Sequence, residues 1–138
     1  MNKQDIKIKE NVRSKIIDQC KLEYPSEACG VILKKKIDGQ EKNTVILEDA
    51  IPMKNRTNEE NKGRFFYIDP LQLLKIEKEI EKTDYDIAGF YHSHPDCTAV
   101  PSEKDLENMI PGMIYLIVSI EKNEDGFSGE IRKYKISQ

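Results

Sequence analysis

The sequence of 138 residues is poor in the features that mark several classes of protein. Its three cysteines, Cys20, Cys29 and Cys97, are odd in number and widely spaced, which does not suit a disulfide framework. No apolar run reaches the length of a membrane span, and the first ten residues, MNKQDIKIKE, contain no apolar signal-peptide core. We therefore expect a protein of the reducing cytoplasm that has no membrane partner.

The chain also lacks an excess of one charge. Its 22 basic and 25 acidic residues are interleaved, and the formal net charge is -3. Nucleic acids favour a concentrated basic patch, so none is expected as the main partner. The length is sufficient to bury a core, and no linker, repeat or low-complexity segment divides the chain. We expect residues 1–138 to form a single domain, and no feature specifies an oligomeric state.

The hydrophobic pattern predicts helices and strands that alternate along the chain. Helices are expected over residues 8–23, from Pro70 with Asp69 as its N-cap, and from the start of PSEKDLENMI at residue 101. Strands are expected at residues 28–33, 44–51, 64–68, 87–94, 113–120 and 129–137. This order predicts an α/β fold in which helices flank one central mixed β-sheet.

Both histidines of the chain fall in the stretch HSHPDCTAVPSEKD, residues 92–105. On a strand, side chains two residues apart share a face, with Cα atoms about 6.6 Å apart, so His92 and His94 can converge on one metal ion while Ser93 faces away. Asp105, on the helix predicted after the loop, is placed to supply a third ligand. Two histidines and one carboxylate leave a coordination position open for water, which is the arrangement of a catalytic zinc site.

Each part of this pattern has a simpler interpretation when taken alone. Backbone carbonyls could satisfy the two histidines, and Ser102 with Asp105 could form only a helix capping box. Glu27 could be a solvated carboxylate at a helix–strand junction. Two histidines and a carboxylate also bind Fe(II) in oxygenases, but those sites usually lie in all-β barrels. The motifs of zinc deaminases and of HExxH proteases are absent from the sequence.

The combined pattern is more specific than its parts. H-x-H-P is followed after six residues by S-x-x-D, and Glu27 lies upstream in YPSEACGVIL. This resembles the JAMM/MPN+ metalloprotease family, whose signature is a glutamate on an early strand, then H-[ST]-H-P, then S-x-x-D. The P-x-E-x-C-G context and the YIDP before the second helix extend the resemblance over most of the chain. A minimal prokaryotic member with a single MPN-type domain is implied.

The resemblance also implies a role for each site residue. His92, His94 and Asp105 would hold Zn²⁺. Glu27 would act as general base and then as general acid, and Ser102 would donate a hydrogen bond to the oxyanion of the tetrahedral intermediate.

Cys97 lies three residues after His94 and could contact the substrate or the metal. A loop cysteine without a chemical role is the simpler interpretation, and Cys29 is interpreted as a small core residue.

The implied reaction is hydrolysis of the peptide or isopeptide bond that follows the C-terminal Gly-Gly tail of a ubiquitin-like or sulfur-carrier protein. Such a tail can be bound as an added strand on a sheet edge. Relatives that have lost metal ligands use the same fold as a non-catalytic scaffold, so the fold alone does not decide the function. Because all five functional positions are present here, the sequence favours an enzyme.

Overall fold

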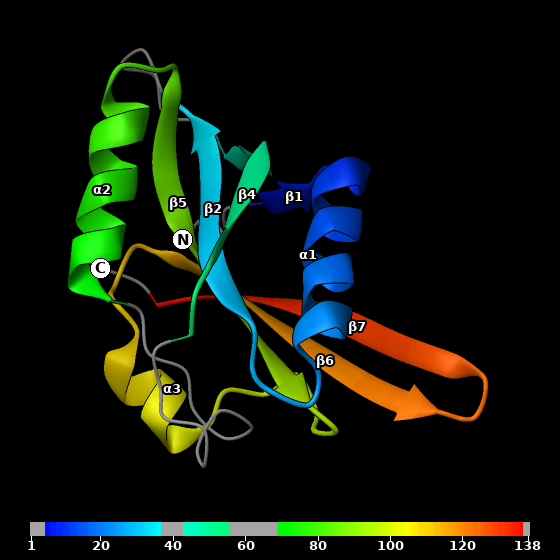
Figure 1. Cartoon of the computed structure of the whole chain (residues 1–138). Coiled ribbons are helices and arrows are strands. Elements are labelled where there is room, and N and C mark those ends of the chain that lie inside the picture. Colours follow the sequence, from blue (N-terminus) through cyan, green and yellow to red (C-terminus); the bar gives the residue numbers. More distant parts are fainter. Residues whose placement is uncertain (1–4, 37–42, 56–68, 137–138) are drawn as a thin grey trace.

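In the computed structural model of the protein, residues 5–36, 43–55 and 69–136 are described (Figure 1). The helices are α1 (Glu10–Glu23), α2 (Pro70–Glu81) and α3 (Glu103–Asn108). The strands are β1 (Asp5–Ile8), β2 (Cys29–Lys35), β3 (Thr44–Leu47), β4 (Asp49–Met53), β5 (Tyr85–Pro95), β6 (Ile114–Asn123) and β7 (Gly126–Lys135). The predicted α/β fold with a mixed sheet is confirmed.

The main sheet has five strands in the order β4-β2-β5-β6-β7. β5 and β6 are parallel, and each other neighbouring pair is antiparallel. β1 and β3 form a separate parallel pair. Because a parallel pair needs a crossover connection, the chain leaves the end of β5, forms α3 and returns to begin β6. In this strand order β5, which contains both histidines, is the middle strand of the sheet.

Two helices cover opposite faces of this sheet (Figure 1). α1 packs Val12 and Ile16 into a buried cluster that includes Ile32 of β2. The neighbouring residue Val31 belongs instead to the cluster under α2, which contains Ile76. Alternate residues of one strand thus enter different clusters, as expected for a strand buried on both faces.

The N-terminal boundary differs from the prediction. α1 begins at Glu10 because residues 5–8 form β1 and pair with β3. Ile6 and Ile8 alternate with polar residues and pack against the α1-side cluster, so the period of two, not the helical period, describes this short segment.

The predicted strand over residues 44–51 is divided into β3 and β4 at Glu48. The backbone N–H of Glu48 donates to the carbonyl of Leu33 at 2.8 Å, while β3 pairs with β1 and β4 pairs with β2. The strand predicted at residues 64–68 lies outside the described residues. The last strand begins at Gly126, earlier than predicted, because its whole length pairs with β6.

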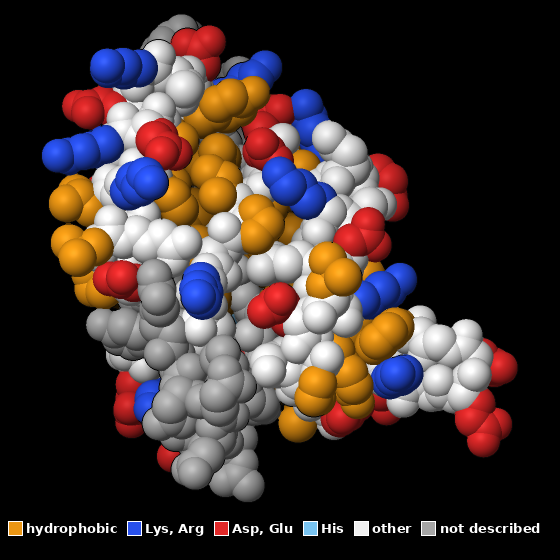
Figure 2. Space-filling model, in the orientation of Figure 1, with side chains coloured by type: hydrophobic (Ala, Val, Ile, Leu, Met, Phe, Trp, Pro, Cys, Tyr) orange, Lys and Arg blue, Asp and Glu red, His pale blue; other side chains and the backbone are white. Residues whose placement is uncertain are grey.

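The visible surface carries basic and acidic side chains that are interspersed (Figure 2). Hydrophobic side chains also reach this surface between α2 and β4, and on α2 itself Leu71 and Leu74 are exposed. Among the described residues, no helix is both long enough and apolar enough to cross a membrane.

Candidate active site

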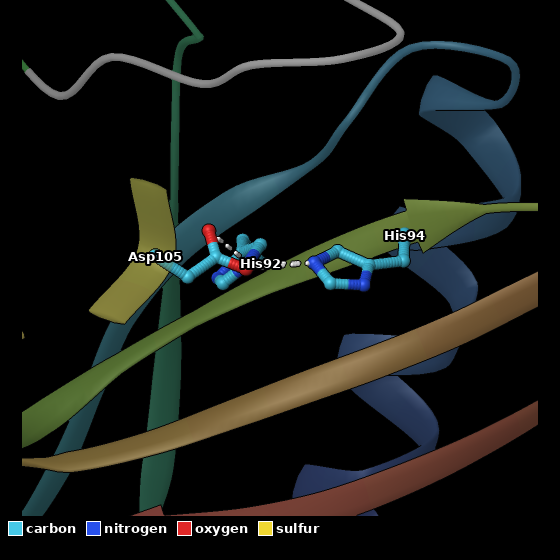
Figure 3. Close-up of side chains that lie close together, drawn as sticks. All are labelled: His92, His94 and Asp105. Carbon is cyan, nitrogen blue, oxygen red and sulfur yellow. Dashed lines mark hydrogen bonds and ion pairs between the residues drawn. The ribbon is translucent and has the colours of Figure 1, made fainter. Parts of the chain in front are cut away.

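The middle strand of the sheet presents two imidazoles on one face. His92 is paired with Cys29 of β2 on one side and with Ile117 of β6 on the other, and its side chain is almost completely buried. His94 lies two residues further along the same strand. The two Nε2 atoms are 3.1 Å apart (Figure 3). The i, i+2 spacing therefore brings the ring nitrogens together, as predicted.

Asp105 reaches these nitrogens from α3. Its Oδ2 lies 3.0 Å from Nε2 of His94, and its Oδ1 lies 3.2 Å from Nε2 of His92 (Figure 3). One ligand atom from each of the three residues lies within 4.8 Å of the others, and no further residue of the described chain joins this group. The structure thus brings together the three predicted ligands from β5 and α3, although His94 and Asp105 are eleven residues apart along the chain.

The capping box predicted at the start of α3 is also present. The Oγ of Ser102 accepts from the backbone N–H of Asp105 at 3.0 Å, and the backbone N–H of Ser102 donates to Oδ2 of Asp105 at 2.9 Å. The cap and the ligand group therefore share the Asp105 carboxylate. Because the cap fixes that carboxylate, it orients Asp105 towards the histidines.

Hydrogen bonds and burial prepare these side chains to bind a cation. Nδ1 of His94 lies 2.9 Å from the carbonyl of Thr98, which can only accept, so Nδ1 carries a proton. Burial opposes a charge on His94, but hydrogen bonds to Asp105 and Thr98 outweigh it and raise its pKa, so a metal ion at Nε2 would take the place of a proton. Burial lowers the pKa of His92, which favours its neutral, ligating form. Burial opposes the charge of Asp105, but hydrogen bonds from His92 and His94 outweigh it and hold the pKa of the carboxyl far below its usual range. Two imidazole nitrogens and one carboxylate oxygen are ligands that suit a divalent transition metal.

Glu27 lies beside this group, two residues before the start of β2. The antiparallel register that pairs Cys29 with His92 continues through Ala28 and Ser93, which places Glu27 across from His94. The residue is 5% exposed. Burial raises its pKa from 4.5 to about 7, while the charge of His94 lowers the pKa and that of Asp105 raises it. The solvated alternative does not apply, and this carboxyl can exchange a proton near neutral pH.

The two cysteines near the site differ in their surroundings. Cys97 is exposed on the loop after β5 and is not a member of the ligand group. Contact between Cys97 and a substrate stays a prediction. Cys29 is buried, its sulfur lies 3.7 Å from the carbonyl of Met53, and burial raises the pKa of its thiol to about 12. Cys29 is thus a core residue, as predicted.

Two buried polar side chains near Glu27 have no signal in the sequence that connects them to the site. The amide of Asn55 donates to the carbonyl of Glu27 at 3.1 Å, and the hydroxyl of Ser93 accepts from the N–H of Ala28 at 2.8 Å. Ser93 does face away from the two histidines, as the alternation predicts. Its partner lies 65 residues away and that of Asn55 lies 28 residues away, so only the folded chain shows either contact.

Comparisons with known proteins identify the family of this chain. A family model for prokaryotic homologs of the JAB domain matches residues 9–132. A desampylase of Haloferax volcanii is 34% identical over 96 residues, which cover 69% of this chain and 63% of that protein. A CysO-cysteine peptidase of Mycobacterium tuberculosis is 29% identical over 130 residues, which cover 94% of this chain and 81% of that protein. The match thus spans less than two thirds of the desampylase.

The fold also matches a solved structure. The solution structure of a protein from Desulfitobacterium hafniense has a TM-score of 0.70 and covers 91% of this chain and 89% of that one. The two sequences are 23% identical, so the likeness shows the fold alone.

Proposed function

Because this chain belongs to the family of prokaryotic homologs of the JAB domain, we propose that it is a zinc-dependent peptidase or isopeptidase. The observation that carries the proposal is the convergence of three ligand atoms, within 4.8 Å of one another, next to a buried carboxyl whose pKa is about 7. A scaffold has no use for such a group, since burying these charges costs stability. Residues 1–138 would act as one catalytic domain, which the match over residues 9–132 supports.

In this proposal His92, His94 and Asp105 hold Zn²⁺. When bound, zinc would supply Lewis-acid chemistry that makes water acidic enough to react near neutral pH. Glu27 accepts a proton from the attacking water and later donates it to the leaving amine. In the metal-free protein this carboxyl has a pKa of about 7, so it can both take up and release a proton near neutral pH, as the two steps require.

Ser102 would stabilise the oxyanion that forms during hydrolysis. In the capping box its Oγ accepts a hydrogen bond through a lone pair, so the hydroxyl proton can still be donated elsewhere. The cap and the oxyanion role are therefore compatible. The side chain is exposed, so a substrate can reach it.

The names of two relatives, a desampylase and a CysO-cysteine peptidase, support a substrate of the ubiquitin-like or sulfur-carrier class. We propose that the substrate presents a C-terminal Gly-Gly tail. Within the described residues β4 is an edge strand, and its last residue, Met53, pairs with Cys29. Because Cys29 follows Glu27 by two residues, the free edge of β4 ends only two register positions before Glu27. An extended tail that pairs along this edge would reach the site.

Metal removal tests this function. The purified protein is expected to contain about one zinc ion per chain, because the ligand set is that of a catalytic zinc site. It should cleave a reporter peptide fused after the Gly-Gly end of a ubiquitin-like protein, lose this activity to a chelator and regain it with zinc. Cleavage that survives chelation would contradict the proposal, and recovery with Fe(II) alone, under exclusion of oxygen, would identify a different metal.

A matched pair of substitutions tests the oxyanion role of Ser102. Aspartate and asparagine are both good N-caps, so neither should lose the roughly 0.5–2 kcal/mol that a cap contributes to the free energy of unfolding. Only asparagine can donate a hydrogen bond. We expect Ser102→Asp to lower kcat by about 10²–10³-fold and Ser102→Asn to retain more activity, measured on zinc-loaded protein. Turnover of Ser102→Asp at the wild-type rate would leave Ser102 only its cap role.

A further inference from the structure

The peptide unit between Glu27 and Ala28 is held at both ends by buried side chains. The amide of Asn55, from the chain just after β4, donates to the Glu27 carbonyl at 3.1 Å. The hydroxyl of Ser93, from β5, accepts from the Ala28 N–H at 2.8 Å. Asn55 is 6% exposed and Ser93 is fully buried. One peptide group is thus fixed by two side chains from different parts of the chain, just before β2 begins.

Ser93 holds this segment especially firmly. In addition to the bond from its hydroxyl, its backbone N–H donates to the carbonyl of Ala28 at 3.0 Å. The hydroxyl also lies near the thiol of the buried Cys20 on α1; burial raises the pKa of that thiol, and Ser93 opposes the shift. The side chain of Ser93 lies on the face of β5 opposite to His92 and His94. His92 and His94 therefore present the two ligands on one face of β5, and Ser93 between them binds the Glu27 segment on the other face.

We propose that Ser93 and Asn55 are positioning residues that hold the Glu27 carboxyl at a fixed place relative to the ligand group. The inference rests on the proposed role of Glu27 in proton transfer. Neither residue belongs to the ligand group, so both act through the backbone of Glu27. A general base must lie within hydrogen-bond reach of its proton, and a displacement of about 1 Å can cost about 10²-fold in rate. Fixing one peptide from both ends limits such a displacement.

A role limited to satisfying buried backbone groups would give different results. It predicts a loss of stability with little change in turnover. The positioning role predicts that Ser93→Ala and Asn55→Ala each lower kcat, by up to about 10²-fold, while KM and zinc content stay near their wild-type values. It also predicts that Ser93→Thr, which keeps the hydroxyl, recovers most of the lost turnover.

The experiment compares these variants as zinc-loaded proteins with Val12→Ala. Val12 belongs to α1 and is buried on the same side of the sheet as Ser93, so its replacement lowers stability without removing a bond to the Glu27–Ala28 peptide. If Ser93→Ala does not fold, Ser93→Cys serves in its place, because sulfur is a weaker acceptor of similar size. A kcat equal to that of Val12→Ala for both positions would overturn the inference.

Glu27→Gln, measured alongside, separates this inference from the proposed function. If Glu27→Gln is inactive while the Ser93 and Asn55 variants match the Val12 control, only the positioning role fails. If Glu27→Gln turns over like the wild type, the role of Glu27 fails, and the positioning role fails with it.

Discussion

Replacing His94 with alanine is expected to abolish metal binding and, with it, hydrolysis. Nε2 of His94 lies 3.1 Å from Nε2 of His92 and 3.0 Å from the Asp105 carboxylate, so this one atom contacts both other ligands. The variant retains only one imidazole and one carboxylate. Loss of an outer-shell partner already costs about 10–100-fold in metal affinity, and loss of a ligand itself should cost more. Zinc analysis after dialysis and the cleavage rate of a Gly-Gly fusion measure the two effects.

Cys97→Ala provides the matched control for this experiment. Cys97 follows His94 by three residues, is exposed and does not belong to the ligand group. Its replacement should leave zinc content unchanged. Zinc retention by His94→Ala, or zinc loss in Cys97→Ala, would show that the metal is held by a different set of side chains.

The part of the site that the sequence predicts depends on local geometry. His92 and His94 share a face because strand side chains alternate, and this holds for any strand at that position. Ser102 and Asp105 form a capping box because the first turn of a helix brings these two positions together. Both patterns extend over a few residues, so their geometry follows once the element type is right.

The remaining contacts depend on pairing between distant strands. Glu27 lies across from His94 only because β2 and β5 pair in one particular register, and local spacing carries no information about that register. The resemblance to a known family supplies the link between Glu27 and the histidines. For Asn55 no motif supplies such a link, since its contact depends on where β4 ends against β2.

The same distinction explains the errors at element boundaries. β1 is four residues long and exists through its pairing with β3, so its local pattern is too short to be separated from the helix that follows. Glu48 divides one apolar run into two strands that pair with different partners. The formation of β1 and the break between β3 and β4 leave no mark in the composition of these segments. Both depend on which strands pair in the folded chain.

Glu27→Gln is expected to reduce hydrolysis by about 10²–10⁴-fold without loss of zinc, because an amide cannot accept a proton from water. Glutamine has nearly the size of glutamate, and Glu27 is not one of the three ligands, so the metal content should stay at the wild-type level. Glu23→Gln is the matched control, since it removes the same charge from an exposed position at the end of α1. Its turnover should equal that of the wild type.

The same substitution should stabilise the metal-free protein at neutral pH. The pKa of Glu27 is 4.5 when unperturbed and about 7 in the folded chain, so between these values the folded state keeps a proton that the unfolded state has lost. The free energy of unfolding of the wild type therefore falls as pH rises through this window, by about 3 kcal/mol in all. The glutamine of the variant does not titrate. Denaturation at several pH values should thus give the variant an advantage that is absent near pH 4 and complete above about pH 8.

A pH-independent difference between the two proteins would mean that the buried carboxyl is not held at a raised pKa. Loss of turnover together with the pH-dependent gain in stability would show that Glu27 serves catalysis while it lowers the free energy of unfolding of the metal-free protein. Such a trade is expected of a proton-transfer group, because the burial that raises its pKa also makes its charged form unfavourable. A residue kept only for structure would show the opposite sign, with its replacement lowering the stability of the metal-free protein.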